Sequence, residues 1–132
     1  MNEKTKFLLH LFVCFIWMAV IFAFSHQANS GHITEAYLHE ANVPIRKLGH
    51  FTEFGILALL YAGLFGRIRS LTDARARMLA LIVAVLYAAS DELHQAFVPG
   101  RSSSIVDVWI DAGGALMALL AVAMIRWIRQ SR

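Results

Sequence analysis

Residues 7–24 read FLLHLFVCFIWMAVIFAF, an apolar run that contains no Asp, Glu, Lys or Arg. About 20 mostly apolar residues are enough for a helix to cross the hydrocarbon core of a bilayer. Comparable, mostly apolar stretches follow at residues 44–66, 78–98 and 104–128. We therefore predict an all-α integral membrane bundle of four transmembrane helices, with residues 1–132 as a single domain.

The composition of the whole chain agrees with this architecture. Hydrophobic residues make up 58% and charged residues 16%, which is well outside the usual balance of a soluble domain. The four stretches and the turns between them occupy most of the 132 residues and leave no room for a soluble domain. We interpret the first stretch as a retained span, because it is longer than a usual signal-peptide core and no clear small-x-small cleavage site follows it.

Basic residues set the expected orientation of the spans. Nine of the twelve fall on one side: Lys4, Lys6, Arg67, Arg69, Arg75, Arg77, Arg126, Arg129 and Arg132. Only Arg46, Lys47 and Arg101 fall on the other side. By the positive-inside rule the first side is cytoplasmic, so we expect both termini in the cytoplasm. These clusters flank spans, and the net charge of +3 therefore does not indicate a nucleic-acid partner.

Acidic residues show a second asymmetry. Five of the nine lie inside or at the ends of the predicted spans: Glu53, Asp91, Glu92, Asp107 and Asp111. A carboxylate in hydrocarbon is costly, so such groups usually face a bundle interior, find partners and mark a functional site. The predicted topology brings all five toward the outer ends of the spans, whose inner halves carry almost no polar groups. We predict a polar pocket that opens to the extracytoplasmic face.

Nine residues are candidates to bind a ligand in this pocket: His50, Glu53, Asp91, Glu92, His94, Gln95, Arg101, Asp107 and Asp111. Four of them, His50, Glu53, Asp91 and Glu92, are also candidates for acid–base catalysis. Arg101, with Arg46 or Lys47, can pair with carboxylates or bind a phosphate, since a guanidinium offers a planar fork. Protonation of some carboxylates and a bound cation are two further ways to hold the acids together.

Simple structural interpretations compete with these functional ones. No zinc spacing such as His-Glu-x-x-His occurs, so we interpret His50 and His94 as hydrogen-bonding groups and assign no metal ion or cofactor. Ser104-Ile105-Val106-Asp107 matches a helix capping box, in which Asp107 stabilises the start of the last span. The other features predict packing: a small-residue seam at Ala80, Ala84 and Ala88, close helix approach at Gly113 and Gly114, and a short interfacial helix in residues 33–41.

Four segments carry a family resemblance. They read FSHQ at 24–27, KLGHFTEF at 47–54, SDELHQ at 90–95 and VPGRSSSIVD at 98–107. Together they resemble the VanZ-like family of small membrane proteins, named for a teicoplanin-resistance protein, over most of the chain. The polar positions typical of that family match at His50, Glu53, Asp91, Glu92, Gln95, Arg101 and Asp107. The resemblance implies a multi-pass protein of the bacterial inner (cytoplasmic) membrane and carries over no catalytic residue.

Three functions are compatible with these observations. We expect first an envelope protein that binds a lipid-tailed or glycopeptide-type ligand in the outer pocket and is linked to teicoplanin resistance. The alternative is an intramembrane enzyme that acts on an envelope lipid through its carboxylates and His50. A third interpretation is a structural network whose function resides in a complex with a membrane protein partner or a second copy. Membrane lipids are expected partners in every case.

Overall fold

The computed structural model describes residues 2–27, 42–101 and 103–131, which form four α-helices and no strand. The helices are α1 (Glu3–Ser25), α3 (Asn42–Phe65), α4 (Asp73–Gln95) and α5 (Ile105–Gln130). The prediction of an all-α fold is confirmed. The interfacial helix predicted in residues 33–41 lies outside the described residues.

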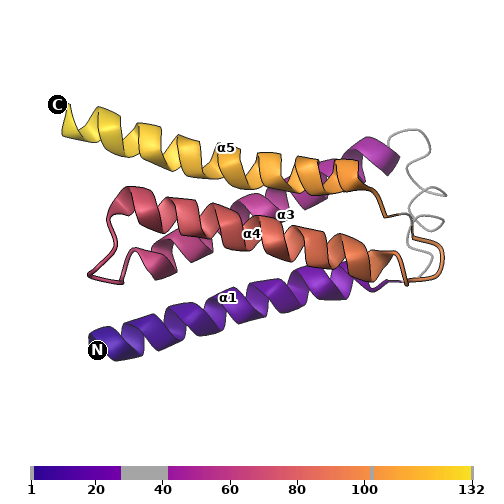
Figure 1. Ribbon diagram of the computed structural model, residues 1–132, viewed down its shortest axis with the longest axis horizontal. Helices are drawn as coiled ribbons and strands as arrows, with labels where there is room; N and C mark the ends of the chain where they lie inside the picture. The colour runs from indigo at the N-terminus through magenta and orange to yellow at the C-terminus, as the bar shows by residue number, and fades with distance from the viewer. Residues whose placement is uncertain (1, 28–41, 102, 132) are drawn as a thin grey trace.

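The four helices run side by side, with α3 and α4 between α1 and α5 (Figure 1). Helices α3 and α4 each contact all of the other described helices, whereas α1 contacts α3 and α4. Because successive helices alternate in direction, both termini lie at one end of the bundle (Figure 1). We call this the terminal end. The opposite end, where α1 and α4 finish and α3 and α5 begin, is called the polar end.

Among the described helices, α1, α3 and α5 are long and apolar enough to cross a membrane. Helix α4 is less apolar, because Asp73, Arg75 and Arg77 lie in its first turns and Asp91 and Glu92 near its end. Three of the four predicted spans are thus confirmed as helices that are long and apolar enough to cross a membrane. The membrane crossing of α4 and the side on which the termini lie stay predictions.

The boundaries of α4 differ from those predicted from hydropathy. The helix begins at Asp73 instead of Met78, because the Thr72 hydroxyl accepts the N–H of Arg75 at 3.3 Å and caps a polar first turn. It ends at Gln95 instead of Val98. Beyond it the chain turns toward α5 through Gly100, whose φ of 73° is readily adopted by glycine.

Small residues determine how closely the helices approach. The predicted alanine seam at Ala80, Ala84 and Ala88 of α4 is buried, and the buried Ala76 extends it by one turn. Helix α5 meets α3 at Gly114, where a methyl group would overlap the Phe51 carbonyl. A methyl group at the neighbouring Gly113 would meet only a Phe51 ring carbon, at 3.8 Å. Close approach is therefore required at Gly114 and not at Gly113.

The outer surface of the bundle is apolar. Large side chains such as Phe12, Leu86, Trp109 and Met117 are all at least 59% exposed. A continuous surface of this kind would be an aggregation hazard in water. In hydrocarbon it is the expected outer face of a helical bundle, since lipid chains are as apolar as the side chains that contact them.

Candidate functional site

Two cavities lie at the polar end. The first has a volume of about 70 Å³, and five of the nine predicted binding residues line it: His50, Glu92, Gln95, Asp107 and Asp111. We call it the carboxylate cavity. Arg46 and Lys47, from the first turns of α3, also line it. Positive side chains therefore lie beside three carboxylates in a small space.

The second cavity has a volume of about 180 Å³, and we call it the arginine cavity. Glu53 and Arg101 line it, together with Phe24 in the last turn of α1 and Gln27, two residues beyond that helix. Arg46 and His50 line both cavities. The two spaces therefore adjoin, and α3 contributes side chains to both.

Asp91 lines neither cavity, although it is buried at the same end of the bundle. Its Oδ2 atom accepts hydrogen bonds from the Ser25 hydroxyl at 2.6 Å and from the Gln95 amide at 2.8 Å. The Gln95 carbonyl oxygen in turn accepts from Arg101 at 2.8 Å. These four residues form a chain of hydrogen bonds that joins α1, α4 and the loop after α4. Asp91 thus does not face a cavity itself, but its hydrogen bond positions Gln95, which lines the carboxylate cavity.

Ser25 was absent from the predicted binding residues. Its side chain is 1% exposed, and its hydroxyl joins the end of α1 to Asp91. The FSHQ segment at 24–27 was the available signal, because Ser25 lies in one of the four segments that carry the family resemblance. In the sequence alone, that segment indicates only the family resemblance.

Glu92 takes the role that the capping-box pattern predicted for Asp107. Ser104 caps α5 as predicted, and its hydroxyl accepts the Val106 N–H at 3.1 Å. The Asp107 carboxylate, however, lies 3.3 Å from Lys47 Nζ. The Ser104 N–H donates to Glu92 Oε2 at 3.0 Å. The carboxylate at this helix start therefore comes from α4, and the predicted capping by the Asp107 side chain is wrong.

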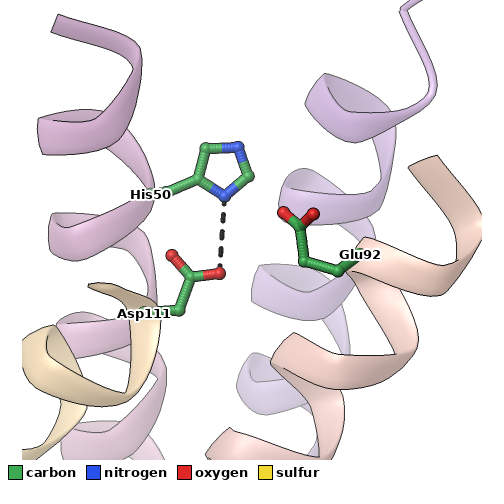
Figure 2. Close-up of side chains that lie close together, drawn as sticks. All are labelled: His50, Glu92 and Asp111. Carbon is green, nitrogen blue, oxygen red and sulfur yellow. Dashed lines mark ion pairs between the residues drawn. The ribbon is translucent and has the colours of Figure 1, made fainter. Parts of the chain in front are cut away.

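His50, Glu92 and Asp111 converge from three different helices (Figure 2). One potential ligand atom from each lies within 4.8 Å of the other two. His50 Nδ1 is 3.6 Å from Asp111 Oδ2. The Asp111 side chain is 0% exposed, and neither of its carboxylate oxygens has a hydrogen-bond partner among the described residues.

His94 lies apart from both cavities, on the side of α4 that faces α1. Its Nε2 is 3.1 Å from His26 Nδ1, and its ring centroid is 4.6 Å from that of Phe22. The structure therefore separates His94 from the other predicted binding residues. A role for it in ligand binding stays a prediction that the cavities do not support.

The positive groups of the polar end lie close to one another. Burial, and next the charge of Arg46, lower the pKa of Arg101 from its ordinary value, while Asp91, Glu92 and Glu53 act to raise it. Arginine remains charged in proteins because its ordinary pKa exceeds 12. The site therefore offers cations for a phosphate or carboxylate group and carboxylates for an amine, a hydroxyl or a metal ion.

Comparisons with known proteins agree with the family resemblance. The family model described as VanZ/LLP1 matches residues 10–126. The matched region includes most of α1 and α5 and all of α3 and α4. No curated protein and no solved structure matches the chain.

Proposed function

Because the chain belongs to the VanZ/LLP1 family, we propose that it is a multi-pass protein of the bacterial cytoplasmic membrane. It binds the head group of a lipid-tailed ligand at its extracytoplasmic end. A lipoglycopeptide of the teicoplanin type fits this class of ligand. Binding of such a ligand would link the protein to teicoplanin resistance.

The orientation follows from the distribution of charge. Among the described residues, eight of the twelve basic residues lie in the first turns of α1, between α3 and α4, in the first turns of α4 or near the end of α5, all at the terminal end. The positive-inside rule assigns that end to the cytoplasm. The polar end then faces the extracytoplasmic side, where envelope ligands are present.

Helix α4 crosses the membrane as the fourth span in this proposal. It lies between α1 and α5 (Figure 1), and its acids Asp91 and Glu92 are 3% and 4% exposed. Ionisable groups inside membrane proteins usually face the bundle interior, as these do. A helix in this position needs less apolar surface than α1, since its neighbours cover much of it.

The observation that carries the proposal is the pair of adjoining cavities that share Arg46 and His50. Arg46 and Arg101 provide planar donors for a phosphate or carboxylate. The carboxylates of Glu53 and Asp107 accept hydrogen bonds from amines or sugar hydroxyls. The apolar outer faces of the helices beside the arginine cavity give a lipid tail a place in the surrounding bilayer.

The proposal is tested by measuring teicoplanin binding to the purified protein in nanodiscs. Arg46→Gln removes a cation that lines both cavities, and we expect at least about tenfold weaker binding. Arg69→Gln makes the same chemical change at an exposed position of the terminal end and should bind normally. Equal binding by the two variants would reject the pocket, and so would an absence of binding to the unaltered protein.

One observation favours an intramembrane enzyme as the second candidate. His50 lines both cavities, and its Nδ1 is 3.6 Å from the buried Asp111 carboxylate. Imidazole and carboxylate groups are side chains that often transfer protons in enzymes. Turnover of an envelope lipid by the purified protein, abolished in His50→Gln, would support this function. Inactivity of the unaltered protein across envelope lipid extracts would count against it.

A further inference from the structure

We propose that His50, Glu92 and Asp111 bind a divalent first-row metal ion such as Zn²⁺ or Mn²⁺ at the polar end. The sequence alone led to no metal assignment, because no zinc spacing such as His-Glu-x-x-His occurs in it. The fold changes that assessment by bringing together three residues from α3, α4 and α5 (Figure 2). The ligand-binding function proposed above does not require this ion.

The geometry suits a small cation. One imidazole nitrogen and two carboxylates form a donor set that Zn²⁺, Mn²⁺ and Fe²⁺ all accept. Bonds of about 2.1 Å in a tetrahedral site place the ligand atoms about 3.4 Å apart. His50 Nδ1 and Asp111 Oδ2 are 3.6 Å apart, and one potential ligand atom from each of the three residues lies within 4.8 Å of the other two. Small side-chain rotations are therefore enough to close the three ligands around an ion.

Asp111 supplies an independent observation that points to a ligand. Its side chain is fully buried and lines the carboxylate cavity, yet both carboxylate oxygens lack a hydrogen-bond partner within the described residues. Burying an ionised carboxylate without hydrogen bonds is costly. At 3.6 Å, His50 is too distant for a good hydrogen bond to this group. A cation between the two side chains supplies the missing interaction.

The surroundings agree with an ion held by three protein ligands. The Ser104 N–H fixes one oxygen of Glu92 and leaves the carboxylate oriented, as second-shell bonds do in metal sites. Lys47, a cation that would oppose a metal ion, is neutralised by Asp107 at 3.3 Å. The cavity of about 70 Å³ has room for water or one ligand group at a fourth coordination position.

The test measures the metal alone. Protein purified without a polyhistidine tag is stripped with a chelator, loaded with Zn²⁺ or Mn²⁺, and desalted. Elemental analysis should then find about one ion per chain. We expect Asp111→Asn and Glu92→Gln to bind at least about tenfold more weakly. Glu53→Gln alters an acid at the polar end that is not one of the three proposed ligands, and this variant should keep the ion. Arg46→Gln should also keep the ion.

A second histidine site must be separated from this one. His26 and His94 lie 3.1 Å apart on the surface and could bind metal by themselves. His94→Gln should therefore retain the ion. The proposal is overturned if the unaltered protein takes up no ion, if Asp111→Asn and Glu92→Gln bind normally, or if only His94→Gln loses the ion.

Thermal unfolding provides a readout that does not depend on elemental analysis. Added metal should raise the Tm of the unaltered protein and leave the Tm of Glu92→Gln unchanged. If Asp111→Asn does not fold, Glu92→Gln still decides the outcome, since its amide oxygen can accept the Ser104 N–H. If Arg46→Gln loses teicoplanin binding and keeps the metal ion, the ligand-binding proposal and the metal-site proposal are shown to be independent of each other.

Discussion

At the polar end of the bundle Asp91, Glu92 and Asp111 are 3%, 4% and 0% exposed, whereas the Asp73 side chain at the terminal end is 64% exposed. Asp73 pairs with Arg126 and lies 3.9 Å from Arg77, in contact with solvent. The buried acids instead contact a hydroxyl, amides and a histidine. The chain thus uses carboxylates at both ends in chemically different environments.

This difference separates two roles of charge in a small membrane protein. Surface ion pairs contribute about 0–1 kcal/mol, and their positive members mainly orient the chain in the bilayer. Buried charges are costly to remove from water, so their convergence from separate helices points to a site. Burial and convergence, more than the number of charges, distinguish the polar end from the terminal end.

Chemical labelling of the two ends should show the largest contrast. In a Cys14→Ser background, which has no other cysteine, Ser103→Cys places a thiol at the polar end and Arg69→Cys places one at the terminal end. A membrane-impermeant maleimide should label Ser103→Cys in intact cells and Arg69→Cys only after permeabilisation. The reverse pattern would invert the proposed topology and expose the cavities to the cytoplasm.

The two neighbouring glycines of α5 should differ strongly in their tolerance of a methyl group. Gly114→Ala should lower the free energy of unfolding by about 3 kcal/mol, because the new methyl overlaps the Phe51 carbonyl and separates α3 from α5. Gly113→Ala should change it by about 0.5 kcal/mol or less. Thermal unfolding in detergent measures both. Similar losses in the two variants would contradict the close contact at Gly114.

Removing one acid from each end tests the comparison directly. Asp91→Ala should cost about 2 kcal/mol of unfolding free energy, because the buried Ser25 hydroxyl and Gln95 amide lose their acceptor. Asp73→Ala should cost less than about 1 kcal/mol, since its ion pairs are solvated. Denaturant titration of the two proteins checks the order. A larger loss of unfolding free energy in Asp73→Ala than in Asp91→Ala would contradict the greater structural importance of the buried acid.

A smaller effect is expected at the start of α5. Glu92→Ala should cost about 1 kcal/mol, because the Ser104 N–H loses its acceptor. Glu92→Gln should nearly preserve stability, since the amide oxygen still accepts. Hydrogen exchange at the Ser104 amide should accelerate in Glu92→Ala only. Equal protection in both variants would show that Glu92 does not hold this helix start.

Several features of the fold could be predicted from the sequence. The lengths of the apolar stretches predicted four helices. The positions of Glu53, Asp91 and Asp111 within those stretches predicted that the polar groups lie at one end of the bundle. The contact between Asp91 and Gln95 also follows from helical spacing, because residues four apart share a face. The depth of a side chain along the bundle can be predicted from its position in the helix, since each helical residue adds about 1.5 Å along the axis.

The direction in which each helix presents its side chains was harder to predict. Glu92 and His94 are about 200° apart around α4 at 3.6 residues per turn, so Glu92 faces the carboxylate cavity and His94 faces α1. Helical spacing indicates that Glu92 and His94 cannot face the same cavity, but which of the two does so depends on how α4 packs against its neighbours. The hydrogen bond from the Ser104 N–H to Glu92, instead of to Asp107, could not be predicted from the sequence, because it depends on how α4 and α5 pack.

The position of both chain termini at the end opposite the cavities has a practical consequence (Figure 1). A helix of 23 residues such as α1 is about 35 Å long. An affinity handle or fluorescent fusion on either terminus is therefore separated from the cavities by the length of the bundle. Molecules immobilised through such a handle on a sensor chip all present the cavities to the flowing sample.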